Sequence, residues 1–436
     1  MPSAAALIIA ASRTKVGGFI MRRLAIVALA AIFTVAACGG STTPPSSGAP
    51  GSAAPAANVP DTIKLGASLP LTGADSTPGK FMKDAYELYI KQLNDAGGLV
   101  VSGKKVKIDL RIEDNKSDAA TSGQLIEKLI TQDNVDLMLG GYNTTTVAQE
   151  VKVVNRLKMP YVGGGGASSS IYVDNQWAVG ILASIEKLAL TQMEFIKTQQ
   201  DAAKLPKPLK IAVAYENSSH GKEFLAGIKQ AETASPDRFK VVFSETFDLA
   251  GKDYTSLLNK VKDANADAYM VDARVNDYIT MQTQYKQLGM YHLYETFGPR
   301  GAEKAARDAL KASSDYIVAA AWFDSLMPGD SVKKWLDTIK VTGDSPEWYL
   351  ASGWEVARIL TGAIQKAGGV DKQKVRDIVF NTTWDTFFPG GSFKFGKNGQ
   401  VDNDYVMTQN TPDGNRIIIW PKDLATGTAT VPIPKK

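Results

Sequence analysis

Residues 135–170 read VDLMLGGYNTTTVAQEVKVVNRLKMPYVGGGGASSS. The stretch contains two short apolar runs, each followed by a turn of small and hydroxyl-bearing residues, with an amphipathic segment between them. Short apolar runs that alternate with helical segments in this way are typical of buried strands in a parallel sheet. The stretch therefore predicts an α/β fold in which both turns lie at the carboxyl ends of strands.

The same alternation extends along the chain in both directions. We expect strands over 63–69, 106–112, 135–139, 160–162, 210–214, 241–247 and 268–271, and helices over 79–96, 119–132, 146–157, 185–198, 254–264 and 278–288. Such a succession predicts parallel sheets covered by helices on both faces. The chain from residue 61 onward is long enough for two such units.

The composition limits the chemistry that the chain can perform. Of 436 residues, 44% are hydrophobic, and only two are His and one is Cys. Zinc sites of His and Cys ligands, iron–sulfur sites and an intrachain disulfide need more of these residues. The catalytic motifs G-x-S-x-G, H-E-x-x-H and C-x-x-C do not occur. We therefore predict a protein that is not an enzyme and that holds neither metal nor cofactor.

Residues 1–37 predict a secretory signal peptide. They contain four basic and no acidic residues, and Met21 is followed by Arg22, Arg23 and an apolar segment. Met21 is the expected true start. The rest of the chain has equal numbers of basic and acidic residues, so the charge gives no reason to expect a nucleic-acid partner.

The only cysteine, Cys38, directly follows the small residues that end this segment. The run 35–38 resembles a bacterial lipoprotein box, in which the cysteine is lipidated and becomes the mature N-terminus. The alternative is a conventional signal with an incidental cysteine. Residues 38–60 contain five prolines and no charge, which predicts a flexible linker. We expect an extracytoplasmic protein that contacts the membrane through its lipid alone.

The two turns of the opening stretch are candidate ligand contacts. Ligands of parallel sheets bind at the carboxyl ends of the strands, and backbone N–H groups and hydroxyls there can hold an anionic or polar group. Ordinary helix capping by Ser and Thr explains the same residues. The turns by themselves leave both interpretations open.

Several segments outside the turns carry a family likeness. They are IKLGASLPLTG at 63–73, LNDAGG at 93–98, EDNKSD at 113–118, SETF at 244–247, KDY at 252–254, GP at 298–299, DG at 413–414 and IIWP at 418–421. Together with the turns they resemble the branched-chain amino acid binding proteins, which are type I solute-binding proteins of ABC transporters. The resemblance runs in family order from about residue 62 to about residue 425.

The resemblance implies two Rossmann-like lobes with parallel sheets flanked by helices, joined by a hinge of three crossovers. The first lobe is expected over 61–180 and 316–386, the second over 181–315 and 387–421, and a C-terminal tail over 422–436. Hinge closure would trap a small amino acid or other carboxylate and present it to an ABC transporter permease. We expect a monomer. The alternatives are a ligand-sensing receptor of the same fold and an extracytoplasmic hydrolase.

The resemblance also implies which residues of the first lobe touch the ligand. These are Asn143, Thr144, Thr145, Gly165, Ala167, Ser168 and Trp348. Thr144 falls where a hydroxyl binds the ligand carboxylate. Ala167 lacks the hydroxyl that is usual at its position, and Ser168 is expected to replace it. Trp322 is a weaker aromatic candidate, and Pro78 stands where many members have an aromatic lid residue.

The second lobe departs from the family pattern. His220 stands in the place of a tyrosine, Asp272 and Arg274 follow a strand, and Arg300 replaces the glutamate that often binds an α-ammonium group. Arginine repels an ammonium group and suits a bidentate grip on a carboxylate. We therefore hypothesise an anionic carboxylate ligand, with Arg300 and Arg274 supplying charge. The alternative is that Arg300 pairs with Asp272 or Glu303, and that Asp272 accepts the ammonium group of an amino acid.

Overall fold

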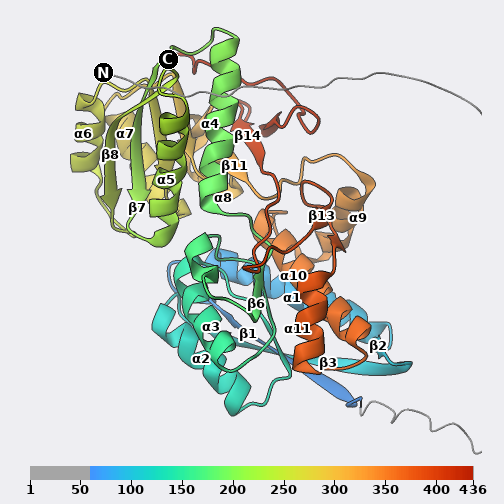
Figure 1. Cartoon of the computed structure of the whole chain (residues 1–436). Coiled ribbons are helices and arrows are strands. Elements are labelled where there is room, and N and C mark those ends of the chain that lie inside the picture. The colour runs from blue at the N-terminus through green and yellow to red at the C-terminus, as the bar shows by residue number, and fades with distance from the viewer. Residues whose placement is uncertain (1–58, 436) are drawn as a thin grey trace, which may run out of the picture. The chain divides into compact units, whose positions relative to one another are not determined.

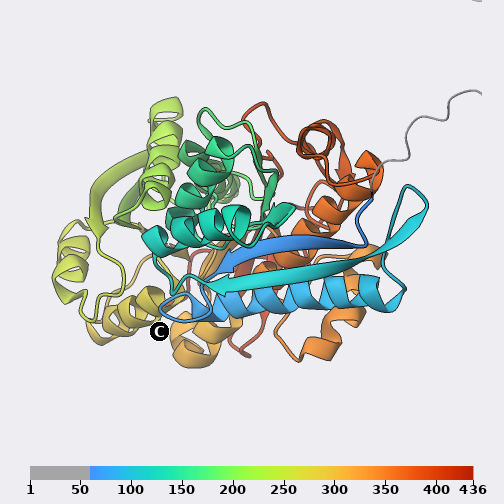
Figure 2. The ribbon, with the colours of Figure 1, turned by 90° about the horizontal axis from the view of Figure 1, so that it is seen from below.

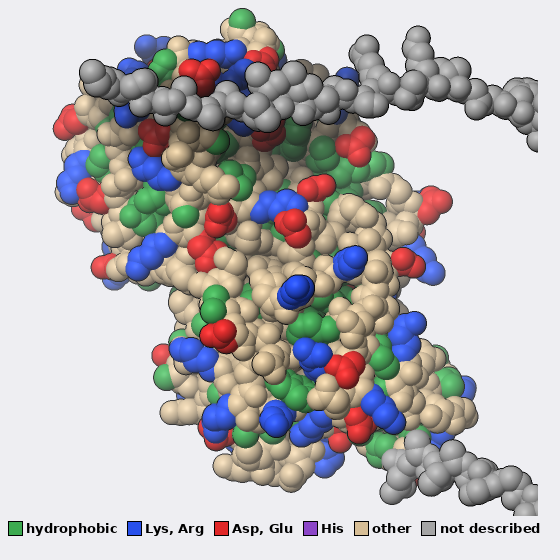
Figure 3. All heavy atoms as spheres, viewed as in Figure 1, with side chains coloured by type: hydrophobic (Ala, Val, Ile, Leu, Met, Phe, Trp, Pro, Cys, Tyr) green, Lys and Arg blue, Asp and Glu red, His purple; other side chains and the backbone are tan. Residues whose placement is uncertain are grey.

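The computed structural model describes residues 59–435, and these residues build two large sheets with helices against their faces, together with one two-stranded sheet (Figure 1). The predicted signal, Cys38 and most of the predicted linker lie outside the described residues. None of the described helices has the length and apolarity that a membrane span requires. On the face shown in Figure 3, Lys and Arg side chains are interspersed with Asp and Glu.

The first sheet comes from the N-terminal part of the described chain. Its strands and accompanying helices are β1 (Thr62–Leu69), α1 (Ser76–Asp95), β2 (Leu99–Val101), β3 (Lys104–Asp114), α2 (Ala119–Thr131), β4 (Leu137–Leu139), α3 (Thr144–Arg156), β5 (Tyr161–Gly163), η1 (Ser169–Tyr172) and β6 (Ala178–Gly180). The strand order is β2-β3-β1-β4-β5-β6, and only the β2–β3 pair is antiparallel. Figure 2 shows α1 on one side of β1 and β3, with α2 and α3 on the other.

The second sheet is built from the middle of the chain and its C-terminal end. Its elements are α4 (Ile185–Asp201), β7 (Leu209–Glu216), α5 (Ser219–Ala234), β8 (Phe239–Phe247), α6 (Thr255–Asp263), β9 (Ala268–Asp272), α7 (Val275–Gln287), β10 (Tyr294–Phe297), α8 (Lys304–Leu310), η2 (Lys311–Ser314), β11 (Val318–Ala321), β14 (Val406–Asn410) and β15 (Arg416–Trp420). The strand order is β15-β14-β11-β10-β9-β7-β8. The strands from β8 to β11 are parallel, and β14 and β15 close the sheet as antiparallel strands.

Between β11 and β14 the chain returns to the first lobe. This part contains α9 (Asp330–Ile339), η3 (Lys340–Thr342), α10 (Trp348–Ala367), α11 (Lys372–Asn381), β12 (Trp384–Asp385) and β13 (Ser392–Phe393). Helix α10 packs along α1 and so covers one face of the first sheet. The chain therefore passes between the sheets three times, as the family resemblance implies.

The lobe boundaries differ from the expected ones at two points. Strand β11 was expected in the first lobe, which was to resume at residue 316, but it pairs with β10 and β14 of the second sheet. All four of its residues are buried, and a buried strand needs partners for its backbone groups. The last crossover lies beyond residue 387, because Gly180 and Gln400 form a bridge beside the first sheet.

Every strand and helix predicted in the sequence has a counterpart whose ends differ by a few residues. Helix α5 was not predicted, nor were α8, α9, α10 and α11, which lie beyond the last predicted element. The N-cap of α5 is Ser218, whose hydroxyl accepts from the N–H groups of His220 (3.1 Å) and Gly221 (3.4 Å). The C-terminal tail belongs to the second lobe, since Ile433 is buried and donates its N–H to the carbonyl of Leu293 at 2.9 Å.

The buried carboxylate of Glu150 on α3 fixes the turn after β4. Glu150 accepts hydrogen bonds from the N–H of Gly141 (2.9 Å) and from the hydroxyls of Tyr161 (2.6 Å) and Ser122 (2.6 Å). Burial raises the pKa of Glu150, while the three donors favour its ionised form. One side chain thus ties α2, α3 and β5 to the turn that carries the predicted ligand contacts.

The turns after β4 and β5 press against each other, which accounts for their glycines. A Cβ atom on Gly165 would lie 1.6 Å from the carbonyl oxygen of Tyr142. The same oxygen accepts the N–H of Gly166 at 3.0 Å. Only glycine lets the two backbones approach this closely.

We expect Glu150→Ala to lower the free energy of unfolding by about 3 kcal/mol, because it leaves buried donors without an acceptor. Urea denaturation would measure the change. Glu127→Ala is the matched control, since Glu127 lies on the surface of the neighbouring helix and pairs with Arg156 at 3.0 Å. The control should cost less than about 1 kcal/mol. Equal losses in the two variants would contradict the central role given to Glu150.

Candidate ligand-binding site

The strand-end turns of both lobes meet at a small cavity, called here the inner cavity. It is lined by Tyr142, Asn143, Thr144, Gly166, Ala167, Leu182, Glu216, His220, Ala273, Arg274, Arg300, Trp322 and Trp348. The residues come from the turns after β4, β5, β7, β9 and β10, from the first turns of α5 and α10, and from the crossovers. Its volume is about 30 Å³, which is room for about one water molecule.

Most of the residues predicted for the site line the inner cavity, but four do not. Thr145 is exposed, and its hydroxyl donates to Asn143 at 2.6 Å. Gly165 lies against the neighbouring turn, and Ser168 and Asp272 are buried just outside the lining. Sequence reasoning missed Tyr142 and Glu216. Glu216 could have been found, because it ends a strand just as Asp272 does.

Two small hydroxyls at or next to the inner cavity lack a partner in the described part of the chain, and only that of Thr144 lines the cavity. Thr144 begins α3 and Ser168 precedes η1, and both hydroxyls are buried without a hydrogen-bond partner among the described residues. Asn143, in contrast, caps α3 by accepting the N–H of Thr146 at 2.9 Å, and donates to Asp75 at 2.8 Å. A buried polar atom without a partner carries a desolvation cost that a bound polar group removes.

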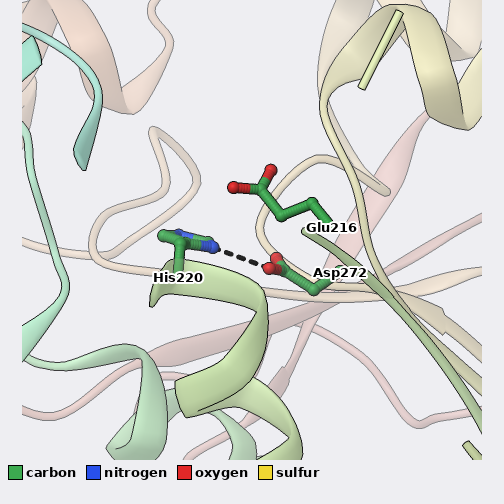
Figure 4. Close-up of side chains that lie close together, drawn as sticks. All are labelled: Glu216, His220 and Asp272. Carbon is green, nitrogen blue, oxygen red and sulfur yellow. Dashed lines mark hydrogen bonds and ion pairs between the residues drawn. The ribbon is translucent and has the colours of Figure 1, made fainter. Parts of the chain in front are cut away.

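The second lobe contributes a cluster of Glu216, His220 and Asp272. The side chains come from the end of β7, the first turn of α5 and the end of β9, and their potential ligand atoms all lie within 4.8 Å of one another (Figure 4). His220 Nδ1 lies 2.6 Å from a carboxylate oxygen of Asp272. Burial disfavours the charged imidazole, but Asp272 and Glu216 outweigh it and raise the pKa of His220.

The cluster has donor atoms of the types that bind Zn²⁺, but its charges are already matched by the protein. His220 and Asp272 share a hydrogen bond, and Arg274 Nε lies 3.9 Å from a carboxylate oxygen of Glu216. Burial raises the pKa of Glu216. A divalent cation here would sit beside a guanidinium group and would have to compete with these pairs, which disfavours a metal site.

Arg300 crosses from the second lobe into an aromatic cage on the first. Its guanidinium group lies 5.2 to 5.8 Å from the ring centres of Tyr142, Trp348 and Tyr349. It donates to the hydroxyl of Tyr142 at 2.8 Å and pairs with Glu303 at 3.3 Å. Guanidinium groups bind well to aromatic faces in this geometry.

The pairing of Arg300 with Glu303 is the alternative stated above, and it removes the main argument for an anionic ligand. Glu303 also accepts hydrogen bonds from Tyr349 and Trp348. Arg274, the other candidate cation, donates to Asp75 of the first lobe at 2.6 Å. Both arginines still line the inner cavity, but each already has a carboxylate partner.

Comparison with known proteins agrees with this geometry. A family model described as periplasmic binding protein matches residues 62–415. The chain belongs to this family. Members are solute-binding proteins that work outside the cytoplasm, so this periplasmic binding protein is not an enzyme.

Individual relatives of this periplasmic binding protein are distant. Leu/Ile/Val-binding protein homolog 7 of Brucella abortus is 24% identical, with 85% of this chain and 94% of the relative covered. The leucine-binding protein LivK of Thermotoga maritima has a TM-score of 0.73 at 15% identity, with 83% of this chain and all of that chain covered. A solute-binding protein of Rhodopseudomonas palustris BisB5 was solved with 3,4-dihydroxybenzoic acid. It has a TM-score of 0.68 at 20% identity, with 80% of this chain and 93% of that chain covered. The structural likenesses show the two-lobed fold.

The contacts of Glu303 predict a dependence of stability on pH. Burial raises the pKa of Glu303 to about 7, against the opposing charge of Arg300. Between pH 4.5 and 7 the unfolded chain loses this proton while the folded chain keeps it, so stability falls as pH rises. We expect a fall of up to about 3 kcal/mol from this group.

Urea denaturation at pH 5 and pH 8 would measure this fall, and Glu303→Gln should remove it. Because the raised pKa of His220 adds a further fall above about pH 6.5, the difference between the variant and the wild type is the quantity to compare. Asp308→Asn on α8 is the control and should keep the wild-type slope. An unchanged slope in Glu303→Gln would contradict the assignment.

Proposed function

We propose that this periplasmic binding protein captures a small solute that carries a carboxylate, an amino acid or another carboxylic acid, and delivers it to an ABC transporter permease. The unpartnered hydroxyl of Thr144 carries the proposal. It lies in the first turn of α3, where the helix dipole and free N–H groups favour an anion. The hydroxyl of Ser168, which also lacks a partner among the described residues, is a second group of the first lobe that could bind the carboxylate.

The second lobe supports an ammonium partner for the same solute. Glu216 lines the inner cavity, and the hydrogen-bonded pair of His220 and Asp272 lies beside it. An amino acid would place its carboxylate at Thr144 and its ammonium group at Glu216. Arg300 already pairs with Glu303. An amino acid therefore leaves this pair intact, whereas an anionic ligand held by Arg300 would have to compete with Glu303.

A simple aromatic carboxylate is the second candidate ligand. Structurally similar solute-binding proteins of Rhodopseudomonas palustris were solved with 3,4-dihydroxybenzoic acid and with benzoate, at 20% and 16% identity. The aromatic side chains of Trp322 and Trp348 line the inner cavity and would contact the carboxylate end of such a solute.

Cross-lobe contacts support capture by closure. Arg274 bonds to Asp75 at 2.6 Å, and Glu223 accepts the N–H groups of Ser169 (2.9 Å) and Ser170 (3.1 Å) from the other lobe. Closure around the solute would create the surface that a permease recognises. A ligand-sensing receptor would use the same closure, and binding to a purified permease would distinguish the two roles.

We further propose that Cys38 is lipidated, and that residues 39–60 tether a monomeric binding protein near its permease. Cys38→Ser should move the protein from the membrane fraction to the soluble fraction, because it removes the acyl chains that bind the bilayer. Fractionation followed by immunoblotting would measure the distribution. Ser41→Ala is the control and should stay with the membrane. A membrane-bound Cys38→Ser protein would overturn the proposal.

A thermal-shift screen against amino acids and carboxylates, followed by calorimetry, would test the ligand class. We expect Thr144→Val to weaken binding of the solute found by about tenfold, the effect of one lost hydrogen bond. Thr146→Val is the matched control, because the hydroxyl of Thr146 donates to the carbonyl of Asn143 at 3.1 Å. Unchanged affinity in Thr144→Val would place the carboxylate elsewhere.

A further inference from the structure

A second and larger cavity, called here the outer chamber, lies beside the inner cavity. Its volume is about 340 Å³, and both lobes line it. Tyr142 and Arg274 line both spaces and therefore stand between them. Tyr142 accepts a hydrogen bond from Arg300, and Arg274 bonds to Asp75. The two cross-lobe contacts form the partition.

The surface that the outer chamber offers is mainly apolar. It includes Pro78, Phe81, Leu249, Val275, Ile279 and Tyr349. These side chains come from α1, the loop after β8, α7 and α10. Apolar groups on both lobes face each other across this space, so an apolar group placed between them would lose its contact with water on two sides.

Charged groups that line the outer chamber already have hydrogen-bond or ion-pair partners within the protein. Asp277 accepts from the hydroxyl of Tyr254 (2.5 Å) and from the N–H of Ala250 (2.6 Å). Lys304 pairs with Asp308 at 2.5 Å. Acidic residues outnumber basic ones in the lining, which disfavours a second carboxylate there.

The two volumes decide where the bulk of a solute can lie. The inner cavity has room for about one water molecule, whereas an apolar cavity of about 150 Å³ holds a benzene molecule. The outer chamber has more than twice that volume. With the lobes in this arrangement, a solute whose carboxylate reaches Thr144 must extend its remaining atoms past the partition.

We infer that the outer chamber is a second compartment of the ligand site, which takes an uncharged aryl or alkyl tail of the solute. The inference rests on the proposed function for the carboxylate end. It narrows the solute to amphipathic amino acids or carboxylic acids whose tail is longer than a branched aliphatic side chain.

Calorimetry on the mature protein, residues 38–436, would test the inference with two matched probe pairs. The pairs are alanine with 2-amino-4-phenylbutyrate, and acetate with 4-phenylbutyrate. We expect the long member of at least one pair to bind at least about tenfold more tightly than the short one, because it buries an aromatic ring. Equal affinities within both pairs would overturn the inference.

Filling the outer chamber gives the second test. Ala305 is an exposed residue of α8 that lines the chamber, and Ala305→Trp should reduce the preference for the long probe at least about tenfold. Ala309→Trp, exposed on the same helix and outside the lining, should keep the preference. Ile279→Trp fills the chamber from α7 and serves if the first variant does not fold. A preference that survives chamber filling would overturn the inference.

The two proposals fail in different ways. Long-probe binding that weakens in Ala305→Trp but not in Thr144→Val would support the outer chamber and overturn the assignment of the carboxylate end. Weakening in Thr144→Val alone would support the proposed function and overturn the outer chamber. Failure of every probe to bind would overturn both.

Discussion

The buried carboxylate of Glu150 organises the site. Its bond to the N–H of Gly141 fixes the turn after β4, and that turn places Tyr142 and Thr144. The hydroxyl of Tyr142 in turn accepts a hydrogen bond from the guanidinium group of Arg300, which belongs to the other lobe. A network inside the first lobe therefore positions both Thr144, a predicted ligand contact, and Tyr142, which bonds to the other lobe. A buried polar group that loses its hydrogen-bond partner in such a network costs free energy. The network is therefore stable in one geometry only.

Closure of the lobes brings charges out of water, and each charge has a partner. Arg300 pairs with Glu303, Arg274 with Asp75, and His220 with Asp272. Buried charges without partners would cost several kcal/mol each. Solute selection is thus left to the groups that the protein has not satisfied itself. Among the described residues at or next to the two cavities, these are the hydroxyls of Thr144 and Ser168 and the apolar walls of the outer chamber.

The sequence predicted the succession of elements well because it depends on local periodicity. Apolar runs such as 63–69 and 268–271 form strands wherever they lie in the chain. The place of β11 was not predicted correctly. Its sequence is equally compatible with either sheet, and only pairing with β10 and β14 assigns it to the second. The turn residues were found because glycine runs at strand ends have a specific use.

The sequence by itself determined the α/β class, the two turns at the strand ends and the likeness to solute-binding proteins, because each follows from residue types at short spacing. The aromatic surroundings of Arg300 were decided by the tertiary structure alone. Tyr142 is 158 residues away from Arg300 in the chain. Trp348 and Tyr349 belong to α10, a helix of the first lobe, whereas Arg300 belongs to the second. The outer chamber likewise exists only where six separate segments of the chain meet. The pairing of Arg274 with Asp75 and the volumes of the cavities depend on such distant contacts, and no local pattern encodes them.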